Sequence, residues 1–320
     1  LKTRINKNKI LVANYDLSTY PTSFDFAFFI EYALMKKEDG NYDDIRFYLI
    51  KPFKSKFHEG INTESENAVD FQSREYRYFN ICVQLLNLYN VDSYSVITKK
   101  DLIENLSNTE NLLIDLEKKP IHHREFYQLV NKFPTRVRGY EASVQSRRYI
   151  KNFLKKFNYK KFCSITLRYY KYHKQRNSNL IEWQKTIDYL QDNQICPIII
   201  PDTDQFGSRI GLKINEDNIF WEGCFDLDLR NALYEESDYN LFVNNGPATL
   251  ATLNKNIKYC TFKFIVKDVE HCTKEFIESQ GYKHNKSPSY ANEFQNWSWN
   301  DDNFDNIKPY VDKFFFGRQF

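Results

Sequence analysis

Short apolar runs alternate with amphipathic stretches along most of this chain, and this alternation limits the possible folds more than any other feature. It is typical of strand–helix units around a mainly parallel sheet, so we expect the α/β class. In the first part of the chain the apolar runs predict strands at 9–13, 45–50 and 94–98. In the second part they predict strands at 161–167, 195–200, 239–243 and 259–266.

The amphipathic stretches between these runs predict helices at 24–33, 63–88, 142–157, 179–190 and 306–316. Thr22 or Ser23 would cap the first of these helices, because hydroxyl side chains accept hydrogen bonds from the free N–H groups of a first turn. Asn179 is followed three residues later by Glu182, which is the spacing of a capping box. We therefore expect the helix after residue 179 to begin with that motif.

The length of 320 residues exceeds one ordinary domain and favours two. Between residues 101 and 140 the pattern weakens into short helical pieces and a basic loop, and we place the boundary there. The predicted domains are an N-terminal Rossmann-like domain at 1–140 and a C-terminal Rossmann-like domain at 141–320. The last helix of the second domain could pack back on the first.

Composition excludes several classes of protein. The chain is 42% apolar and 17% aromatic, far more than a disordered chain carries. A mean hydropathy of −0.65, with no apolar run near the ~20 residues that span a bilayer, excludes an integral membrane protein. The formal net charge of +3 is too small to identify a nucleic-acid binder. Six cysteines without a Cys-x-x-Cys spacing indicate free thiols, so we expect a cytoplasmic location.

The segment Asn244, Asn245, Gly246, Pro247 and Ala248 directly follows a predicted strand and opens a predicted short helix. Proline suits the first helical position, because the N–H that it lacks would have no partner within the helix. The remaining N–H groups of the first turn would face the edge of the sheet. Such N–H groups and the positive end of the helix dipole attract anions. The segment predicts an anion site, and the alternative is an ordinary turn with an asparagine cap.

A basic loop follows the strand at 161–167. Arg168 ends that strand, and Lys171, Lys174 and Arg176 follow before Asn177 and the next helix. Arginine offers a planar fork to paired oxygens, so this loop could bind a diphosphate or a carboxylate. A solvated basic loop is the plain alternative. A nucleic-acid site is a third, in which bases would stack on Tyr169, Tyr170 and Tyr172.

Two carboxylates, Asp202 and Asp204, follow the strand at 195–200. Open α/β sheets bind ligands beyond the carboxyl ends of their strands, so either carboxylate could accept hydrogen bonds from ribose or sugar hydroxyls. A metal site is the less favoured alternative, because no histidine lies near them in sequence. The strand itself is apolar throughout, which suits a central position, although Pro197 requires an edge or a bulge.

The first half offers further candidates. Asp16 leaves the first strand and Asp25 opens the first helix, so either could act as a general base toward an acceptor hydroxyl, or simply cap a turn. Basic side chains before the domain boundary could line the opposite wall of a cleft, although surface or structural roles are the simpler reading for the histidines. These candidate acceptor-side or cleft residues are His122, His123, Arg136 and Arg138.

Several of these segments, taken in order, resemble the donor-binding half of GT-B glycosyltransferases. The likeness is to bacterial enzymes of surface-polysaccharide loci and, more remotely, to heptosyltransferases and fucosyltransferases. It covers about residues 140 to 265. The segments that carry it are 164–168, with the sequence Ser-Ile-Thr-Leu-Arg, 176–179 followed by Trp183, 199–202, and 244–248.

The resemblance implies two Rossmann-like domains that face a cleft, with a nucleotide-activated sugar held mainly by the second and the acceptor on the side of the first. By position, Arg168 would face the donor phosphate. Asn245 and Gly246 would form the turn whose helix receives phosphate or sugar, and Asp202 would meet nucleotide or sugar hydroxyls. The chain lacks the Glu-x7-Glu motif of many retaining enzymes and the metal-binding Asp-x-Asp setting of GT-A enzymes, so retention or inversion stays open.

The function expected on these grounds is metal-independent transfer of a sugar from a nucleotide-activated donor to a glycan or lipid-linked acceptor, in surface polysaccharide synthesis. We expect no cofactor, no metal and no nucleic-acid partner, and at most peripheral association with the inner face of a membrane. Two alternatives remain: a sugar-nucleotide epimerase or hydrolase on the same fold, and a non-catalytic module that binds a nucleotide or glycan.

Overall fold

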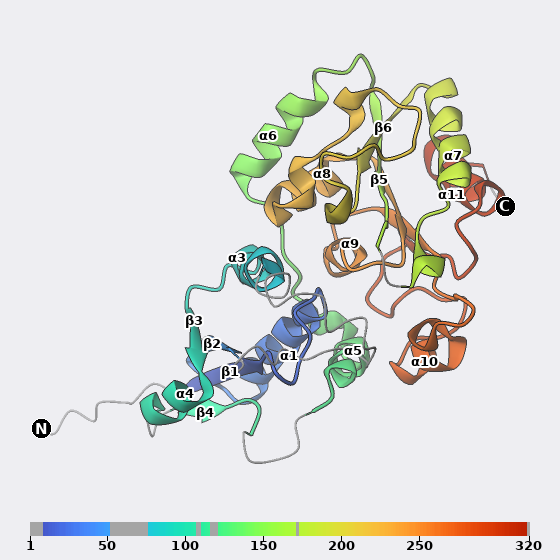
Figure 1. Ribbon diagram of the computed structural model, residues 1–320. Coiled ribbons are helices and arrows are strands. Elements are labelled where there is room, and N and C mark those ends of the chain that lie inside the picture. Colours follow the sequence, from blue (N-terminus) through green and yellow to red (C-terminus); the bar gives the residue numbers. More distant parts are fainter. Residues whose placement is uncertain (1–8, 52–75, 107–109, 116–120, 171–172, 319–320) are drawn as a thin grey trace, which may run out of the picture. The chain divides into compact units, whose positions relative to one another are not determined.

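The computed structural model shows an α/β protein that divides into two compact units, each with its own parallel sheet (Figure 1). The expected fold class and the two Rossmann-like domains are confirmed. The units are Leu1–Arg138 and Gly139–Phe320, so the division falls two residues before the predicted one. Gly139 has a φ of +63°, and a Cβ there would lie 2.3 Å from the carbonyl oxygen of Leu253. The residues described are 9–51, 76–106, 110–115, 121–170 and 173–318.

Unit 1 contains a four-stranded sheet in the order β3-β2-β1-β4, and every pairing in it is parallel. The three predicted strands are confirmed. Strand β4 was not predicted, because it pairs with β1 through only three residues, Glu-Asn-Leu, and has no apolar run to reveal it. The strands are β1 (Ile10–Asp16), β2 (Asp44–Lys51), β3 (Tyr94–Thr98) and β4 (Glu110–Leu112).

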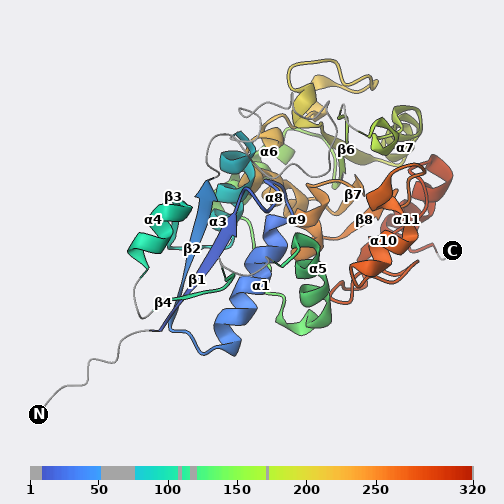
Figure 2. The same ribbon diagram turned by 60° about the horizontal axis from the view of Figure 1, so that its bottom comes forward.

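The helices of unit 1 are led by α1, which is buried along its first ten residues and packs beside α5 (Figure 2). The predicted cap at Thr22 or Ser23 is wrong, because α1 begins after Asp25, and the Ser23 hydroxyl donates to the Asp25 carboxylate. The predicted start of the next helix at residue 63 lies outside the described residues. The described helices are α1 (Phe26–Asp39), a π-helical turn (Tyr78–Val83), α3 (Gln84–Leu88), α4 (Lys99–Asn105) and α5 (His123–Lys132).

Unit 2 contains a five-stranded sheet in the order β6-β5-β7-β8-β9, again parallel throughout. The four predicted strands are confirmed, with β8 shorter than expected, and β9 was missed. The apolar strand β6 is an edge strand, as Pro197 requires, and its free edge is covered by residues 218–220. The strands are β5 (Lys161–Thr166), β6 (Ile195–Ile200), β7 (Tyr239–Val243), β8 (Tyr259–Phe262) and β9 (Gln295–Trp297).

The cover of β6 explains how so apolar a strand can stand at an edge. The Asn218 side-chain amide donates to the carbonyl oxygen of Pro197 over 2.8 Å, and the Phe220 N–H donates to that of Ile199 over 2.8 Å. Carbonyl groups that would face solvent are therefore paired. Every residue of β6 is buried as a result.

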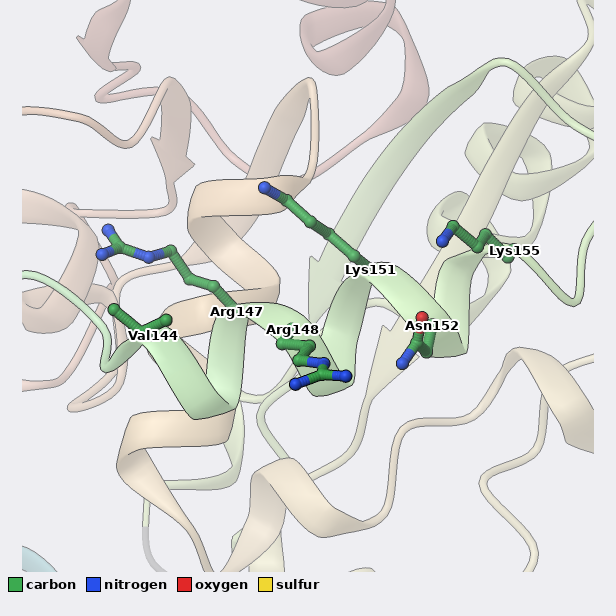
Figure 3. A pocket seen from close by; sticks show the side chains of 6 residues that line it. All are labelled: Val144, Arg147, Arg148, Lys151, Asn152 and Lys155. Atoms are coloured by element: carbon green, nitrogen blue, oxygen red, sulfur yellow. The ribbon is translucent and has the colours of Figure 1, made fainter.

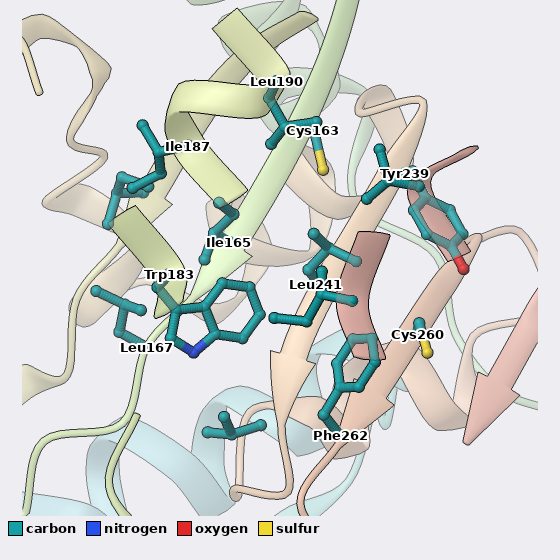
Figure 4. Packing of buried hydrophobic residues seen from close by; sticks show 14 of the residues in the cluster. Cys163, Ile165, Leu167, Trp183, Ile187, Leu190, Tyr239, Leu241, Cys260 and Phe262 are labelled. Atoms are coloured by element: carbon teal, nitrogen blue, oxygen red, sulfur yellow. The ribbon is translucent and has the colours of Figure 1, made fainter. Parts of the chain in front are cut away.

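The helices of unit 2 pack around a large apolar core in which the indole of Trp183 lies against Phe262, with ring centroids 6.4 Å apart (Figure 4). The C-terminal helix, which could have packed on the first domain, packs on α7 and buries Ile307 and Val311 in the core of unit 2. The helices are α6 (Val144–Leu154), α7 (Leu180–Asp192), α8 (Leu227–Glu236), α9 (Ala248–Leu253), α10 (Lys274–Ser279) and α11 (Phe304–Phe316).

Short 3-10 turns connect many of these elements, at Pro134–Arg136, Lys174–Arg176, Thr203–Gln205, Glu216–Asn218, Glu222–Cys224 and Glu270–Cys272. All six cysteines are buried and free. Across the parts of the chain that the structure describes, we find no helix with the length and apolarity needed to cross a membrane.

The start of α7 is held by a buried carboxylate rather than by the predicted capping box. Asn179 makes no side-chain cap, and the Glu182 carboxylate accepts the N–H of Phe304 over 2.9 Å. Asp302 is fully buried, and its Oδ2 accepts both the Asn179 N–H and the Trp183 indole N–H over 2.8 Å. Its Oδ1 accepts the ammonium of Lys263 over 2.8 Å. A segment far along the chain therefore supplies the cap.

We predict that Asp302→Ala destabilises unit 2 by about 3–5 kcal/mol, because it leaves a nearly buried Lys263 ammonium and two N–H groups without their acceptor. Urea unfolding followed by tryptophan fluorescence measures the change, since Trp183 touches this carboxylate. The matched control is Asp301→Ala, whose carboxylate also pairs with Lys263, over 3.4 Å, but is 64% exposed; we expect a loss of about 1 kcal/mol or less. Equal losses of stability in the two variants would contradict the conclusion that the Asp302 carboxylate holds the start of α7.

Candidate functional site

Parallel pairing brings the carboxyl ends of the central strands of unit 2 to one edge of the sheet. Thr166 at the end of β5 is level with Ile200 of β6 and with Phe242 of β7. The residues that the sequence analysis singled out follow directly: Arg168 after β5, Asp202 after β6 and Asn244 after β7. This is the edge at which open α/β sheets bind ligands.

The loop after β5 is fastened by Asn177. The Asn177 Oδ1 accepts the N–H of Tyr170 over 3.0 Å and also a hydrogen bond from the Arg168 guanidinium, and its amide donates to the carbonyl of Tyr170 over 3.0 Å. The Arg168 N–H donates to the hydroxyl of Ser178 over 2.9 Å. Asn177 was predicted to contact a donor; the structure shows it joining the two ends of its own loop. Lys171, also predicted, lies outside the described residues.

The same loop is hydrogen-bonded to the turns after three other strands. The Tyr169 N–H donates to the Asp202 carboxylate, which follows β6, over 3.1 Å. The Arg176 Nη2 donates to the carbonyl of Asn244, which follows β7, over 3.0 Å. Lys263 follows β8, and its ammonium donates to the carbonyl of Asn177 over 3.0 Å. The structure thus brings together Arg168, Arg176, Asn177, Asp202 and Asn244.

Two guanidinium groups dominate the electrostatics of this edge. Arg168 is only 8% exposed, and burial, followed by the nearby charge of Arg176, lowers its pKa to about 10. Within the described residues Arg176 makes no ion pair with a carboxylate. Burial also raises the pKa of Asp202 above its ordinary value, because the charged carboxylate loses solvation there. Asp202 is therefore a poor source of negative charge to balance the two guanidinium groups. An anion placed beside Arg176 would therefore be favoured.

A histidine that the sequence analysis missed completes the surroundings of Arg176. The Arg176 Nη1 lies 2.9 Å from the Nε2 of His271, and the ring of His173 lies 4.9 Å from that of His271, edge to face. A guanidinium only donates hydrogen bonds, so the Nε2 of His271 is the acceptor in this contact. No motif surrounds His271, which lies 95 positions from Arg176. Only the fold brings the two residues together.

The turn at 244–248 differs from its prediction. The Asn245 Oδ1 accepts the N–H of Ala248 over 3.0 Å, while the N–H groups of Thr249 and Leu250 donate to the carbonyls of Gly246 and Pro247 over 3.0 Å. The prediction of free N–H groups in this first turn is therefore wrong at 248, 249 and 250, where each N–H has an acceptor. The helix that follows, α9, has six residues, and the asparagine-cap alternative describes the turn.

The two carboxylates proposed as general bases make local hydrogen bonds in unit 1. The Oδ1 of Asp16 accepts the N–H of Ser18 over 2.9 Å and its hydroxyl over 2.6 Å. Asp25 accepts the Ser23 hydroxyl over 2.6 Å through Oδ2, and the Tyr127 hydroxyl through Oδ1. The Asp16 bonds are those of the turn-capping alternative, whereas the Asp25 side chain makes no capping bond to the backbone. A catalytic role for either residue stays a prediction.

The basic residues before the boundary also make structural contacts. The His122 Nδ1 accepts the N–H of Arg124 over 3.3 Å as the cap of α5. Arg136 contacts the last turn of α1 through the Asp39 carboxylate at 2.8 Å and the Met35 carbonyl at 2.8 Å. The side chain of His123 lies outside what the structure describes. The backbone N–H of Arg138 donates over 3.0 Å to the carboxylate of Glu31, which is fully buried.

The metal alternative finds no support at Asp202 and Asp204. The N–H of Asp204 donates to the Oδ1 of Asp202 over 3.3 Å, so the two residues form a local turn. In the described parts of the chain, no group of three or more His, Cys, Asp or Glu side chains could hold a metal ion. Independence from metals stays a prediction.

Comparisons with known proteins return solved glycosyltransferases, all distant. They include a family 9 glycosyl transferase from Veillonella parvula, with 8% identity, 80% of each chain covered and a TM-score of 0.41. A second is the ADP-heptose LPS heptosyltransferase II of E. coli, with 11% identity, 91% of this chain and 90% of that chain covered and a TM-score of 0.43.

A third solved structure is the dodecameric, iron-containing heptosyltransferase TibC in complex with ADP-D-β-D-heptose. Its identity is 9% and its TM-score 0.38, with 80% of this chain and 58% of that chain covered. No family model and no curated protein matches the chain.

We predict that Asn177→Ala destabilises unit 2 by about 1–3 kcal/mol. The variant removes three hydrogen bonds of the Asn177 side chain, two to the backbone of Tyr170 and one to the Arg168 guanidinium. Urea unfolding measures the loss. Asn177→Asp is the matched control: it keeps the acceptor for Arg168 and for the Tyr170 N–H and loses only the bond to the Tyr170 carbonyl. It should lose less stability than the alanine variant. If both variants unfold like the wild type, Asn177 does not hold the loop.

Proposed function

We propose that this protein is a metal-independent glycosyltransferase that moves a sugar from a nucleotide-activated donor to a glycan or lipid-linked acceptor in surface polysaccharide synthesis. The observation that carries the proposal is the position of Arg176. Its guanidinium joins the loops after β5 and β7 at the carboxyl edge of the sheet, close to a second guanidinium and without a carboxylate partner in the described residues. The sequence resemblance to GT-B donor domains points to the same edge.

The reaction needs positive groups at this place. When the glycosidic bond to the donor breaks, negative charge develops on the departing nucleotide phosphate. Fixed donors aimed at that charge stabilise the transition state by roughly 3 kcal/mol each, on the scale known for oxyanion-hole donors. Arg176 is such a donor and is held by Asn244 and His271. Arg168 is buried and bonded to its own loop, so its charge contributes mainly through the field that it adds.

Two further roles, binding of donor hydroxyls and removal of the acceptor proton, fall to carboxylates. The Asp202 carboxylate accepts one N–H on each oxygen and retains lone pairs for ribose or sugar hydroxyls. For removal of the acceptor proton, Asp16 is the better candidate of the two in unit 1. Its described hydrogen bonds use one carboxylate oxygen, whereas those of Asp25 use both.

We predict that Arg176→Gln weakens the binding of the preferred nucleotide at least tenfold, since a hydrogen bond to a charged group contributes about 1.5–3 kcal/mol. A thermal-shift screen against UDP, GDP, CDP, CMP and ADP first identifies that nucleotide, because a ligand that binds the native state raises its stability. Isothermal titration then gives the two dissociation constants. Arg168 is unsuitable for this test because it is buried and bonded within the loop.

The matched control is Arg209→Gln, which removes one exposed arginine from the same unit and should bind as the wild type does. No stabilisation by any of the five nucleotides at millimolar concentration would refute the donor site. Equal affinities of the Arg176 and Arg209 variants would refute the role of Arg176.

Turnover separates the enzyme from the alternatives. We predict that the matching nucleotide sugar releases its nucleotide only when an acceptor glycan or lipid-linked sugar is present, as measured by a coupled nucleotide-release assay. Release without acceptor would identify a hydrolase, and a changed sugar without release an epimerase. Binding without any conversion across a panel of acceptors would identify a binding module. Chelation of divalent cations should leave the rate unchanged.

A further inference from the structure

The positive charge of this chain is concentrated in one segment. Residues 142–181 contain eleven Lys or Arg and not a single Asp or Glu. The whole chain has a formal net charge of +3, so subtracting these eleven charges leaves −8 for the other residues. The candidate donor site uses the second part of this segment, from Arg168 onward. The first part belongs to α6 and the residues after it, and the proposed reaction makes no use of them.

The outer surface of α6 forms an open cavity of about 460 Å³ (Figure 3). Five of the six side chains that line it come from this helix and the sixth from Lys155, the residue that caps its C-terminus; four of the six are cationic. We call these residues the α6 basic face: Val144, Arg147, Arg148, Lys151, Asn152 and Lys155.

Much of the charge on the α6 basic face is not neutralised by the protein. Arg147 lies 3.4 Å from the carboxylates of Glu141 and Glu235, and Lys151 lies 3.5 Å from Glu236 with 60% of its side chain exposed. Arg148 and Lys155 are exposed and make no ion pair with any described residue. Two of the four cations of this face therefore have no paired carboxylate in the described part of the chain, while Arg147 and Lys151 have one or more.

The opposite side of α6 fixes the helix in place. Ile150 is fully buried, Phe153 and Leu154 are nearly so, and α6 packs against α8. The hydroxyl of Ser146 adds a hydrogen bond of 2.7 Å to the carboxylate of Asp228 on α8. The basic face is therefore presented on a rigid support.

An apolar element accompanies the cations. Val144 lines the cavity with 69% of its surface exposed, and Tyr149, on the same helix, is 44% exposed. Helices at a membrane interface place apolar or aromatic side chains beside Lys and Arg. On α6 the exposed ones are Val144 and Tyr149, and the Tyr149 hydroxyl donates to the Glu222 carboxylate over 3.0 Å. A lipid offers both matching chemistries, a phosphate group and the adjoining hydrocarbon, whereas a nucleic-acid backbone offers no hydrocarbon to Val144.

We propose that the α6 basic face docks unit 2 on an anionic membrane surface, with lipid phosphate groups between the cations of α6. This docking does not rest on the proposed function, because it involves none of the residues of the donor site. Its expected consequence is reversible binding that depends on anionic lipid and weakens with salt, because exposed charges are screened within about 8–10 Å at physiological ionic strength.

Vesicle flotation tests the proposal with the intact chain. We expect binding to phosphatidylcholine vesicles that contain about 30% phosphatidylglycerol and little binding to phosphatidylcholine alone, since each cation near such a surface contributes to attraction. The double variant Arg148→Gln/Lys155→Gln should lower the partition coefficient by roughly thirtyfold, from about 1 kcal/mol per removed cation. Both side chains are exposed, so its urea unfolding should match the wild type.

The matched control is Lys274→Gln/Lys283→Gln, which removes two exposed positive charges from other parts of unit 2. It should partition as the wild type does. The proposal is overturned if the wild type ignores anionic vesicles at low salt, or if both double variants lose equal affinity. It is also overturned if single-stranded RNA binds to α6 and the vesicles do not.

Discussion

The buried carboxylate of Asp302 makes the interactions on which the candidate site of unit 2 depends. It accepts hydrogen bonds from the start of α7 and from the Trp183 indole, and it pairs with Lys263, which follows β8. Lys263 in turn donates to the carbonyl of Asn177 in the loop after β5. A carboxylate in the apolar interior is stable only with such partners, so the arrangement of three distant segments is fixed together.

The loop after β5 connects this buried cluster to the candidate site. Asn177 joins its two ends, Tyr169 binds Asp202 from the neighbouring turn, and Arg176 binds the carbonyl of Asn244. The result is a guanidinium without a carboxylate partner in the described residues, held at the edge of a parallel sheet. Pre-organised positive charge at a place where phosphate charge develops is the physical basis of the proposed transfer reaction.

The sequence predicts the fold class and most strands, because apolar runs mark strands that are covered on both faces. It does not predict β4 and β9, which are three residues long and contain one apolar residue each, so local pattern could not reveal them. It grouped Arg168, Arg176, Asp202 and Asn244 correctly, since parallel strands must end at one edge. It could not predict Asp302, Lys263 or His271, because their roles come from contacts between residues 39 to 123 positions apart.

The central claim is that the phosphate of a bound nucleotide lies against Arg176, and a crystal structure of the protein with the nucleotide selected by stability screening tests it most directly. The account predicts that an oxygen of the terminal phosphate lies within hydrogen-bond distance of the Arg176 guanidinium, beyond the ends of β5 and β7. A nucleotide bound elsewhere on the chain, with Arg176 still contacting only His271 and the Asn244 carbonyl, would contradict it.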